Sequence, residues 1–452
     1  MDPITDWHAL LRPDEELTPR YTAAFATAMR GQKLTFGQRV HCPFLRPFFL
    51  TPGDETRIRN AAQTIAALGE RVIRAALASD DLYEQLGVTE AEDPLIDIDP
   101  GYGTASTASR LDAFLLPDAL WFAEYNAESP AGIGYTQRLC ELFDTTEVMG
   151  RFRRDRQVRY HRVIDALLEA LVASYREWGG TSRAPTIAIV DWRDVPTWTE
   201  FEILRDAFSA AGVPTIVCDP RELVFGNGVL TAQGTRIDLV YRRVLVNDVI
   251  ARRDECRALV DACAARVVCM ANSFRCKLAH KKAFFAVLTD PEHESLFSPA
   301  ELAVVRSHVP WTRILDDVEV DKGEWRGDLL ELARAWREHL VLKPNDEYGG
   351  TGVTLGWELT EGEWDARLES ALEDPYGTWV VQERIPVRRE IFPQFDSLGL
   401  VSMNDMLVDL APYLFRGQMG GYLTRLSGSG LANVTSGGGQ VPAFVVDDGW
   451  GE

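Results

Sequence analysis

Two stretches in the N-terminal part of the chain carry apolar residues at helical spacing. Within 54–86, apolar side chains recur every three or four positions, which is the period of one helix face. They are Ile58, Ala62, Ile65, Leu68, Val72, Ile73, Ala76 and Leu77. The same spacing returns at about 152–177, and the Gly-Gly-Thr-Ser run at 179–182 is typical of a helix stop and a linker. The pattern predicts two long amphipathic helices.

From residue 185 the pattern changes to short apolar runs that alternate with helical spacing. The runs lie at 186–190, 214–218 and 237–241. Thr199 and Glu202 have the spacing of a capping box, and Gly212 is placed to end the helix between the first two runs. This β-α-β order predicts a parallel sheet over about 185–270. Because Asp191-Trp192-Arg193-Asp194 replaces the glycine fingerprint after the first run, a dinucleotide site is not predicted.

The C-terminal part, about 271–452, begins with a predicted helix at 277–288 and continues into strand-rich sequence. Strands are expected at 339–343, 352–357 and 379–385, with glycine-rich connections at 347–352 and 436–439. At roughly 100–200 residues per domain, the length of 452 residues predicts two to four domains. The changes of pattern give the expected boundaries as 1–180, 181–270 and 271–452.

Composition and charge narrow the class of protein. The chain is 46% hydrophobic and 25% charged, and 68 acidic against 47 basic residues give a net charge of −21. This surplus disfavours nucleic acid and anionic lipid as partners, because both bind through Lys and Arg. No apolar run approaches the roughly 20 residues of a membrane helix, and Met1–Asp6 lacks the basic start of a signal peptide. We therefore expect a cytoplasmic protein that acts on small molecules.

The seven cysteines are odd in number and form no C-x-x-C pair. This argues against a disulfide framework and against a ribbon-type zinc site. Four of them fall within 256–276, but no histidine lies at ligand spacing among them. We expect the cysteines to be small buried residues.

The segment 110–126 is predicted to form a hairpin that turns at Pro117-Asp118-Ala119. Pairing about residue 118 places Asp112 opposite Glu124 and Arg110 opposite Asn126, and strand alternation puts all four on one face. The other face is predicted to carry Leu111, Ala113, Leu115, Trp121, Ala123 and Tyr125.

Two carboxylates and an amide on one face are hard oxygen ligands, which suit Mg²⁺ better than zinc or copper. Without a cation, the facing carboxylates of Asp112 and Glu124 would repel each other, and one would tend to stay protonated. The alternative is a hairpin face whose charges are simply solvated. The residue types alone leave both interpretations open.

A second motif joins an apolar strand ending at Lys343 to a loop that contains Gly349, Gly350 and Gly352. Glycines let backbone N–H groups approach phosphate oxygens, and the lysine adds a positive charge. The G-x-x-x-x-G-K-[ST] pattern is absent, so this is not a Walker A loop. A simple glycine-rich turn is the alternative interpretation.

Two further segments carry polar groups. Trp379–Ile385 is a strand that ends in Gln382 and Glu383, which could face an adenine edge. The segment after Gly421 contains Arg425, Asn433 and the glycine run 437–439. Taken alone, the first is an ordinary strand and the second a surface loop.

In combination, these segments resemble the ATP-grasp ligases. The resemblance rests on Lys343 with its glycine loop, on Val381-Gln382-Glu383, on the stretch from Arg425 to the glycine run, and on the Arg-x-Asp…Glu-x-Asn hairpin. The hairpin comes first in this chain and last in standard members, so the sequence looks circularly permuted. That order is similar to the synthetase domain of glutathionylspermidine synthase. The resemblance implies a mixed α/β fold of the circularly permuted ATP-grasp type, with an inserted Rossmann-like pre-ATP-grasp domain.

The resemblance also implies a role for each matching residue. Asp112, Glu124 and Asn126 would hold two Mg²⁺ ions on ATP. Phosphate contacts would come from Lys343, from the loop of Gly349, Gly350 and Gly352, and from Lys282, for which Lys281 is an alternative. Gln382, Glu383 and the Ile385 backbone would line the adenine pocket. Arg110 would stabilise an acyl phosphate and the tetrahedral species formed from it, and Arg425 would close the acceptor side with the glycine run.

The expected activity is therefore ATP-dependent ligation of a small carboxylic acid to a small amine, with ADP and phosphate released. A kinase that stops at a phosphorylated product and a non-catalytic ATP-binding protein remain as alternatives. Arg242 and Arg243, after the strand at 237–241, could hold an acidic substrate or form a surface ion pair.

Overall fold

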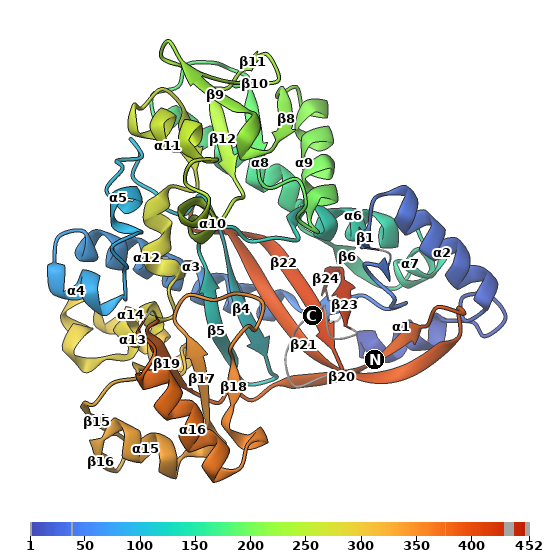
Figure 1. Cartoon of the computed structure of the whole chain (residues 1–452). Coiled ribbons are helices and arrows are strands. Elements are labelled where there is room, and N and C mark those ends of the chain that lie inside the picture. The colour runs from blue at the N-terminus through green and yellow to red at the C-terminus, as the bar shows by residue number, and fades with distance from the viewer. Residues whose placement is uncertain (1, 38, 376, 429–437, 448–452) are drawn as a thin grey trace.

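The computed structural model describes residues 2–37, 39–375, 377–428 and 438–447 of the chain. Helices and several separate sheets are interspersed along it, so the predicted mixed α/β class is confirmed (Figure 1). Of the predicted acceptor segment, Asn433 and Gly437 lie outside the described residues.

The central sheet has the strand order β23-β22-β21-β4-β5, and β20 pairs with β21 beyond this path. All neighbours in it are antiparallel. The strands are β4 (Ala108–Leu115), β5 (Leu120–Asn126), β20 (Arg388–Phe395), β21 (Val401–Phe415), β22 (Gln418–Ser427) and β23 (Gly439–Val441). In Figure 1 the teal hairpin of the N-terminal part lies directly beside the red strands of the C-terminal part.

The hairpin β4–β5 confirms the predicted register at its functional end, where Arg110 pairs with Asn126 and Asp112 with Glu124. A β-bulge after Asp112 shifts the pairing by one residue, so that Ala113 faces Phe122. The predicted apolar face is therefore wrong at Trp121 and Ala123. Phe122 is fully buried instead, because the extra residue turns this end of β5 over.

The first predicted helix is divided into α3 (Pro52–Ala76) and α4 (Asp80–Gln85), and a new N-cap at Ser79 starts the second piece. α3 begins with a capping box between Thr51 and Asp54 and packs its apolar stripe against β21 and β22. The second helix, α8 (Val163–Glu177), is shorter than predicted. The missing part holds α7 (Glu147–Phe152) and β6 (Gln157–Arg159), because residue 158 pairs with residue 446 in a sheet that local periodicity cannot reveal.

The predicted parallel sheet is confirmed, with the order β13-β12-β7-β8. Its strands are β7 (Ile187–Val190), β8 (Thr215–Cys218), β12 (Leu239–Arg242) and β13 (Cys269–Ala271). The connecting helix α9 (Trp198–Ala210) has Thr197 at its N-cap and no side-chain cap, so the capping box of Thr199 and Glu202 is wrong. The Thr199 hydroxyl instead lies 2.6 Å from that of Tyr135. Gly212 follows the helix at φ +83°, as predicted.

A third sheet, with the order β14-β19-β17-β18, carries the lysine strand. Its strands are β14 (Thr312–Ile314), β17 (Leu340–Pro344), β18 (Thr354–Leu355) and β19 (Trp379–Glu383). The strand predicted at 352–357 is thus only two residues long, since a 3-10 turn begins at Gly356. The helix predicted at 277–288 is broken into α12 (Lys277–His280) and α13 (Ala283–Thr289) by the extended backbone of Lys281.

The remaining elements surround these sheets. They are α1 (Pro3–Leu10), α2 (Pro19–Gly31), α5 (Asp93–Ile96), α6 (Ile133–Asp144), α10 (Val246–Ala251), α11 (Arg257–Ala264), α14 (Pro299–His308), α15 (Leu329–Ala335), α16 (Glu361–Leu372), β1 (Thr35–Phe36), β2 (Arg39–Val40), β3 (Phe48–Leu50), β9 (Leu223–Gly226), β10 (Val229–Ala232), β11 (Thr235–Arg236), β15 (Glu319–Lys322), β16 (Trp325–Asp328) and β24 (Ala443–Asp447). Among the described residues, buried apolar side chains form three clusters, of which the largest fills the space around the central sheet. The domain boundaries expected from the sequence stay a prediction.

All seven cysteines are free and buried, as expected from their spacing. Burial raises the pKa of Cys42, for example, to about 12, so it is a neutral packing residue at neutral pH. Within the described residues, no helix combines the length and the apolar character that crossing a membrane would need.

Asn272, just after β13, joins the parallel sheet to the hairpin. Its side-chain nitrogen lies 2.7 Å from the Ala108 carbonyl, 2.8 Å from that of Ala127 and 2.8 Å from that of Glu128. Its side-chain oxygen accepts from the Ala108 N–H at 2.9 Å. The residue is 1% exposed, so water cannot replace these bonds.

We predict that Asn272→Ala lowers the free energy of unfolding by about 2–4 kcal/mol, because several buried backbone groups lose their partner at once. Urea denaturation followed by circular dichroism measures this. Asn60→Ala, at an exposed position of α3, is the matched control and should change the value by less than about 0.5 kcal/mol. An equal effect of the two substitutions would contradict the role of Asn272 in joining the parallel sheet to the hairpin.

Candidate active site

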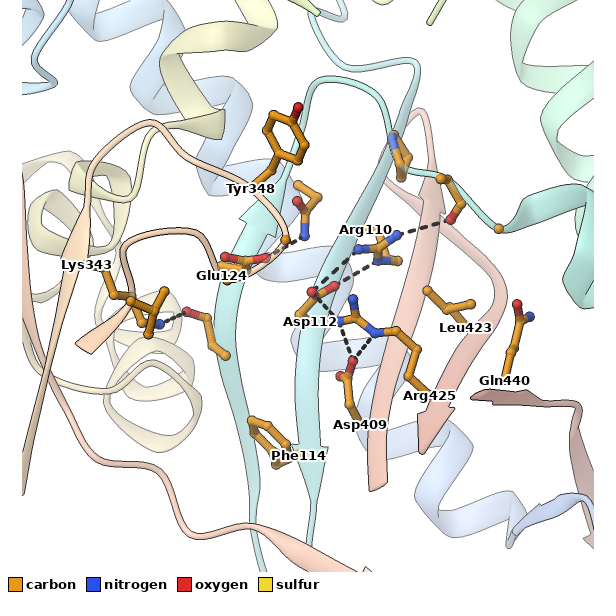
Figure 2. A pocket seen from close by; sticks show the side chains of 18 of the residues that line it. Arg110, Asp112, Phe114, Glu124, Lys343, Tyr348, Asp409, Leu423, Arg425 and Gln440 are labelled. Carbon is orange, nitrogen blue, oxygen red and sulfur yellow. Dashed lines mark hydrogen bonds and ion pairs between the residues drawn. The ribbon is translucent and has the colours of Figure 1, made fainter. Parts of the chain in front are cut away.

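A cavity of about 720 Å³ opens where the three sheets meet, and most of the predicted site residues line it (Figure 2). The lining includes Arg110, Asp112, Glu124, Asn126, Lys343, Gly349, Gly350, Gln382, Glu383, Ile385 and Arg425. Lys282 and Gly352 do not line it. Residues more than 300 positions apart in the chain are thus brought to one place.

A row of polar side chains crosses the central sheet from β23 to β5. Gln440 pairs with Arg425, Arg425 pairs with Asp409, and Asp112 pairs with Glu124. The pair formed by Tyr413 and Arg110 joins the two halves of the row. Since directly paired residues of an antiparallel sheet point to the same side, the whole row faces the cavity.

The centre of the row is a group of four charges, Arg110, Asp112, Asp409 and Arg425. Arg110 Nε donates to Asp112 Oδ1 at 2.8 Å, and Arg425 Nη2 donates to Asp112 Oδ2 at 2.5 Å. Arg425 Nε also donates to Asp409 Oδ2 at 2.5 Å. Figure 2 shows the two guanidinium groups converging on the Asp112 carboxylate from different strands.

The two carboxylates respond differently to this environment. Burial by itself would raise the pKa of Asp112, but the charges of Arg110 and Arg425 outweigh it and hold the pKa well below the usual range. Burial raises the pKa of Asp409 to about 6, against the opposing charge of Arg425. Asp112 is therefore a firmly ionised group between two cations.

Asp409 is the residue of this group that the sequence-based prediction missed. It is the one charged residue in the buried run Met406–Phe415 of β21. A lone carboxylate inside a long apolar strand is a usable signal, because a buried charge requires a partner. The sequence could not identify that partner, since Arg425 becomes its neighbour only through the pairing of β21 with β22.

Glu124 and Asn126 form the second part of the row, on β5. Asn126 Nδ2 donates to Glu124 Oε1 at 3.2 Å, and the nearest cation recorded for Glu124 is Lys282 Nζ at 3.8 Å from Oε2. Both of these contacts of Glu124 are long, so a cation could replace them.

The donor set of Asp112, Glu124 and Asn126 fits a hard divalent cation by its chemistry. No three His, Cys, Asp or Glu side chains of the described chain gather as a metal cluster, and Asn126 would be the third oxygen donor beside Asp112 and Glu124. A cation at Asp112 would compete with Arg110 and Arg425, which already bind both oxygens of this carboxylate.

Lys343, at the end of β17, reaches the cavity from the third sheet. Its Nζ donates to Gln382 Oε1 at 2.6 Å and to the Ala123 carbonyl at 3.2 Å, which ties the third sheet to the hairpin. Burial lowers the pKa of Lys343 to about 8, and the charge of Lys282 acts in the same direction. The loop that follows has Gly349 at φ +67° and Gly350 at φ +81°, in the left-handed region that favours glycine.

The neighbouring lysines point to different places. Lys282 Nζ donates to the Glu347 carbonyl at 2.5 Å, at the start of the glycine loop. Lys281 is 2% exposed, and its Nζ donates to Glu92 at 2.9 Å and to Asp346 at 3.2 Å. Lys281 is thus a buried structural residue that anchors the base of the loop, whereas Lys282 reaches the start of the loop and lies 3.8 Å from Glu124, which lines the cavity.

The polar end of β19 borders the same cavity. Gln382 Nε2 donates to Thr312 Oγ1 at 3.1 Å, which orients its oxygen toward Lys343. Glu383 forms an ion pair with Lys322 at 2.7 Å, and Ile385 lines the cavity just beyond the strand.

The opposite end of the cavity lies at the carboxyl ends of β7 and β12. Arg242 is fully buried and pairs with Glu128 at 2.9 Å, whereas Arg243 lines the cavity beside Asp191. The alternative of a surface ion pair is therefore wrong for both arginines. Burial raises the pKa of Asp191 to about 6, against the charge of Arg243. Ligands of open α/β sheets commonly bind at such strand ends.

Comparison with known proteins finds a similar fold but no similar sequence. No protein-family model matches the sequence, and no curated protein is significantly similar to it. The structure is similar to that of a glutathione synthetase-like effector from Globodera pallida in the apo form, with a TM-score of 0.63 and 13% identity, covering 96% of this chain and 99% of that one. A protein from Methylobacillus flagellatus KT, provisionally named gamma-glutamylcysteine synthetase, gives a TM-score of 0.41 and 11% identity over 83% of this chain and 86% of that one. The first likeness concerns the fold alone, and the second is too weak to support a conclusion.

Proposed function

We propose that this protein is an ATP-dependent ligase that joins a small carboxylic acid to a small amine and releases ADP and phosphate. The observation that carries the proposal is that the Arg-x-Asp…Glu-x-Asn hairpin, Lys343 and its glycine loop line one cavity, although they lie more than 200 residues apart. The fold likeness to a protein named as glutathione synthetase-like supports a ligase. We leave the identity of the acid and the amine open.

We further propose that the fold is a circularly permuted ATP-grasp fold, as in the synthetase domain of glutathionylspermidine synthase. The hairpin at 108–126 precedes the lysine strand in sequence but completes the same sheet as β21 and β22. Within this proposal, the parallel sheet of β7, β8, β12 and β13 belongs to the inserted pre-ATP-grasp domain.

In the proposed complex, Lys343, Lys282 and the loop of Gly349, Gly350 and Gly352 hold the phosphates of ATP. Gln382, Glu383 and the Ile385 backbone face the base. Asp112, Glu124 and Asn126 would hold Mg²⁺, in the number of two ions that the resemblance implies. Bound Mg²⁺ would neutralise phosphate charge during phosphoryl transfer.

The proposed reaction begins when a substrate carboxylate oxygen attacks the γ-phosphorus and the bond from that phosphorus to the β-phosphate oxygen breaks. ADP leaves, and the carboxylate becomes a mixed anhydride. The amine nitrogen then attacks the carbonyl carbon, loses a proton, and phosphate departs with the C–O bond. Arg110 and Arg425 stabilise the negative charge that develops at the acyl group, a contribution that typically accounts for about 10²–10³ in rate per donor.

We predict that Mg·ATP raises the thermal midpoint of the protein and that Asp112→Asn or Glu124→Gln abolishes this rise. Each substitution removes a proposed cation ligand without changing the size of the side chain. Differential scanning fluorimetry with and without Mg·ATP measures the effect. Glu301→Gln, on α14 and not part of the cavity lining, is the control and should keep the response. An unchanged rise in both site variants would refute the metal assignment.

We predict that the affinity for Mg·ATP falls as the pH rises through about 8. The neutral form of Lys343 predominates above its pKa of about 8, and binding to phosphate then requires uptake of a proton. Below that pH the lysine is already charged and affinity should be constant. Isothermal titration calorimetry from pH 6.5 to 9.5 measures this.

Lys343→Met should weaken binding by about 10–100-fold below pH 8 and remove the pH dependence. Lys33→Met, at a half-buried lysine that pairs with Glu202 and does not line the cavity, is the control and should show the wild-type profile. A wild-type profile that is flat, or one that survives in Lys343→Met, would contradict this role of Lys343.

We predict that ADP release in a screen of carboxylic acids depends on the presence of an amine and yields an amide. Arg110→Lys should lower the rate by about 10²–10³, because a point charge replaces a guanidinium fork. Mass spectrometry of the products is the measurement. A stable phosphorylated product that forms without amine would instead identify a kinase, and ATP binding without any turnover would identify a binding protein.

A further inference from the structure

The Asp112 carboxylate has two sets of binding partners, two arginines and a proposed cation, and it cannot bind both sets at once. Both of its oxygens accept hydrogen bonds from arginine, Oδ1 from Arg110 and Oδ2 from Arg425. The same carboxylate stands opposite Glu124 as a proposed cation ligand. A divalent cation at Asp112 would be repelled by two guanidinium charges in direct contact with its ligand, so the carboxylate must exchange one set of partners for the other.

The two arginines have supports that do not depend on Asp112. Arg110 Nη1 donates to the Ala131 carbonyl at 3.1 Å. Arg425 Nε is held by Asp409, which in turn accepts from the Ala113 N–H at 3.3 Å. Both guanidinium groups can therefore keep their positions when the carboxylate between them moves away (Figure 2).

The net charge of the four-residue group depends on whether Asp112 is part of it. Arg110 and Arg425 against Asp112 and Asp409 give a group with no net charge. When Asp112 leaves, the two arginines and Asp409 carry a net charge of +1. The vacated place then matches a singly charged anion that can accept hydrogen bonds from two guanidinium groups, which is the chemistry of a carboxylate.

We infer that Arg110 and Arg425 form a carboxylate-binding site that Asp112 occupies in the free protein, and that cation binding at Glu124, Asn126 and Asp112 draws the carboxylate away and opens the site to the acid substrate. This inference rests on the proposed function, of which it specifies the order of binding. Asp112 is an internal competitor of the substrate, and Asp409 is a positioning residue for Arg425.

The consequence is a coupling between two ligands. The magnesium nucleotide should tighten the binding of a carboxylate, and the carboxylate should tighten the binding of the nucleotide by the same factor, since linkage is reciprocal. Couplings of this kind typically amount to about 5–150-fold in affinity.

Acetate is the probe for the test, titrated at constant ionic strength and followed by ligand-observed NMR. A magnesium complex of a non-hydrolysable ATP analogue fills the nucleotide site without turnover. For the wild-type protein we expect weak acetate binding alone and binding that is at least 5-fold tighter with the magnesium analogue.

Three variants test whether Asp112 itself, the net charge of the four-residue group or cation binding controls the acetate affinity. Asp112→Asn should bind acetate at least 5-fold more tightly than the wild type with no cation present, and the magnesium analogue should add nothing. Asp409→Asn removes the same charge from the same group but leaves Asp112 on the two arginines, so it should not reproduce the gain in acetate affinity of Asp112→Asn. Glu124→Gln keeps the Arg-Asp contacts and loses a cation ligand, so its acetate affinity should stay low with or without the analogue.

The outcomes distinguish the inference from the function on which it rests. If the magnesium analogue binds but leaves the acetate affinity of the wild type unchanged, the inference is overturned and the proposed function stands. If Asp409→Asn gains as much affinity as Asp112→Asn, net charge explains the gain and the inference is overturned as well. If the analogue does not bind at all, both fail. The wild-type comparison decides the matter even if Asp112→Asn does not fold.

Discussion

The cavity depends on one buried arrangement, the alternation of two arginines and two carboxylates across β4, β21 and β22. Asp112 is 6% exposed and Asp409 1% exposed, so neither charge is stabilised by water. Removing one partner from such a group typically costs about 3–5 kcal/mol, because a buried charge is left unpaired. The row therefore holds together only when strands from both ends of the chain meet in one register. Stability and site formation are the same event here, since β4 contributes Arg110 and Asp112 to a sheet whose strands β20 to β23 come from the C-terminal part of the chain, beginning at residue 388.

The central sheet also determines where side chains of the parallel sheet and of the sheet that carries Lys343 contact it. Lys343 on β17 contacts the Ala123 carbonyl at the β-bulge of the hairpin, so the bulge both reorients the end of β5 and provides an acceptor for the lysine. Asn272, at the end of β13, is bonded to the backbone at the other end of the same hairpin. The hairpin is thus the common contact of all three sheets. The cavity lies at their junction for this reason, with the carboxyl ends of the parallel strands on one side and the glycine loop on the other.

The sequence predicts what is decided locally and misses what is decided by distant pairing. The pairs of Arg110 with Asn126 and of Asp112 with Glu124 could be predicted because a hairpin fixes its own register. The parallel sheet could be predicted from the order of apolar runs. Helix bounds near residue 158 could not, because that residue pairs with one in β24. Asp409 was also missed because of distant pairing. No pattern near it in the sequence indicates that Arg425 is its partner. The directions of the Lys281 and Lys282 side chains could not be predicted either, because a break in the helix, not its periodicity, sets them.

The net charge of −21 has a different meaning inside the cavity from that on the surface. The acidic excess of the whole chain disfavours polyanionic partners. The cavity lining, by contrast, carries as many basic as acidic side chains, so the cavity is locally far less negative than the molecule around it. The arginines of the row are paired with carboxylates, so they can bind an anion only if one of these carboxylates releases them. Asp112 is placed to do so, because it is the carboxylate that contacts both cavity arginines of the row and also faces the proposed cation site. In the binding order inferred above, electrostatic balance in the free protein and anion binding after cation entry would both follow from the position of a single side chain.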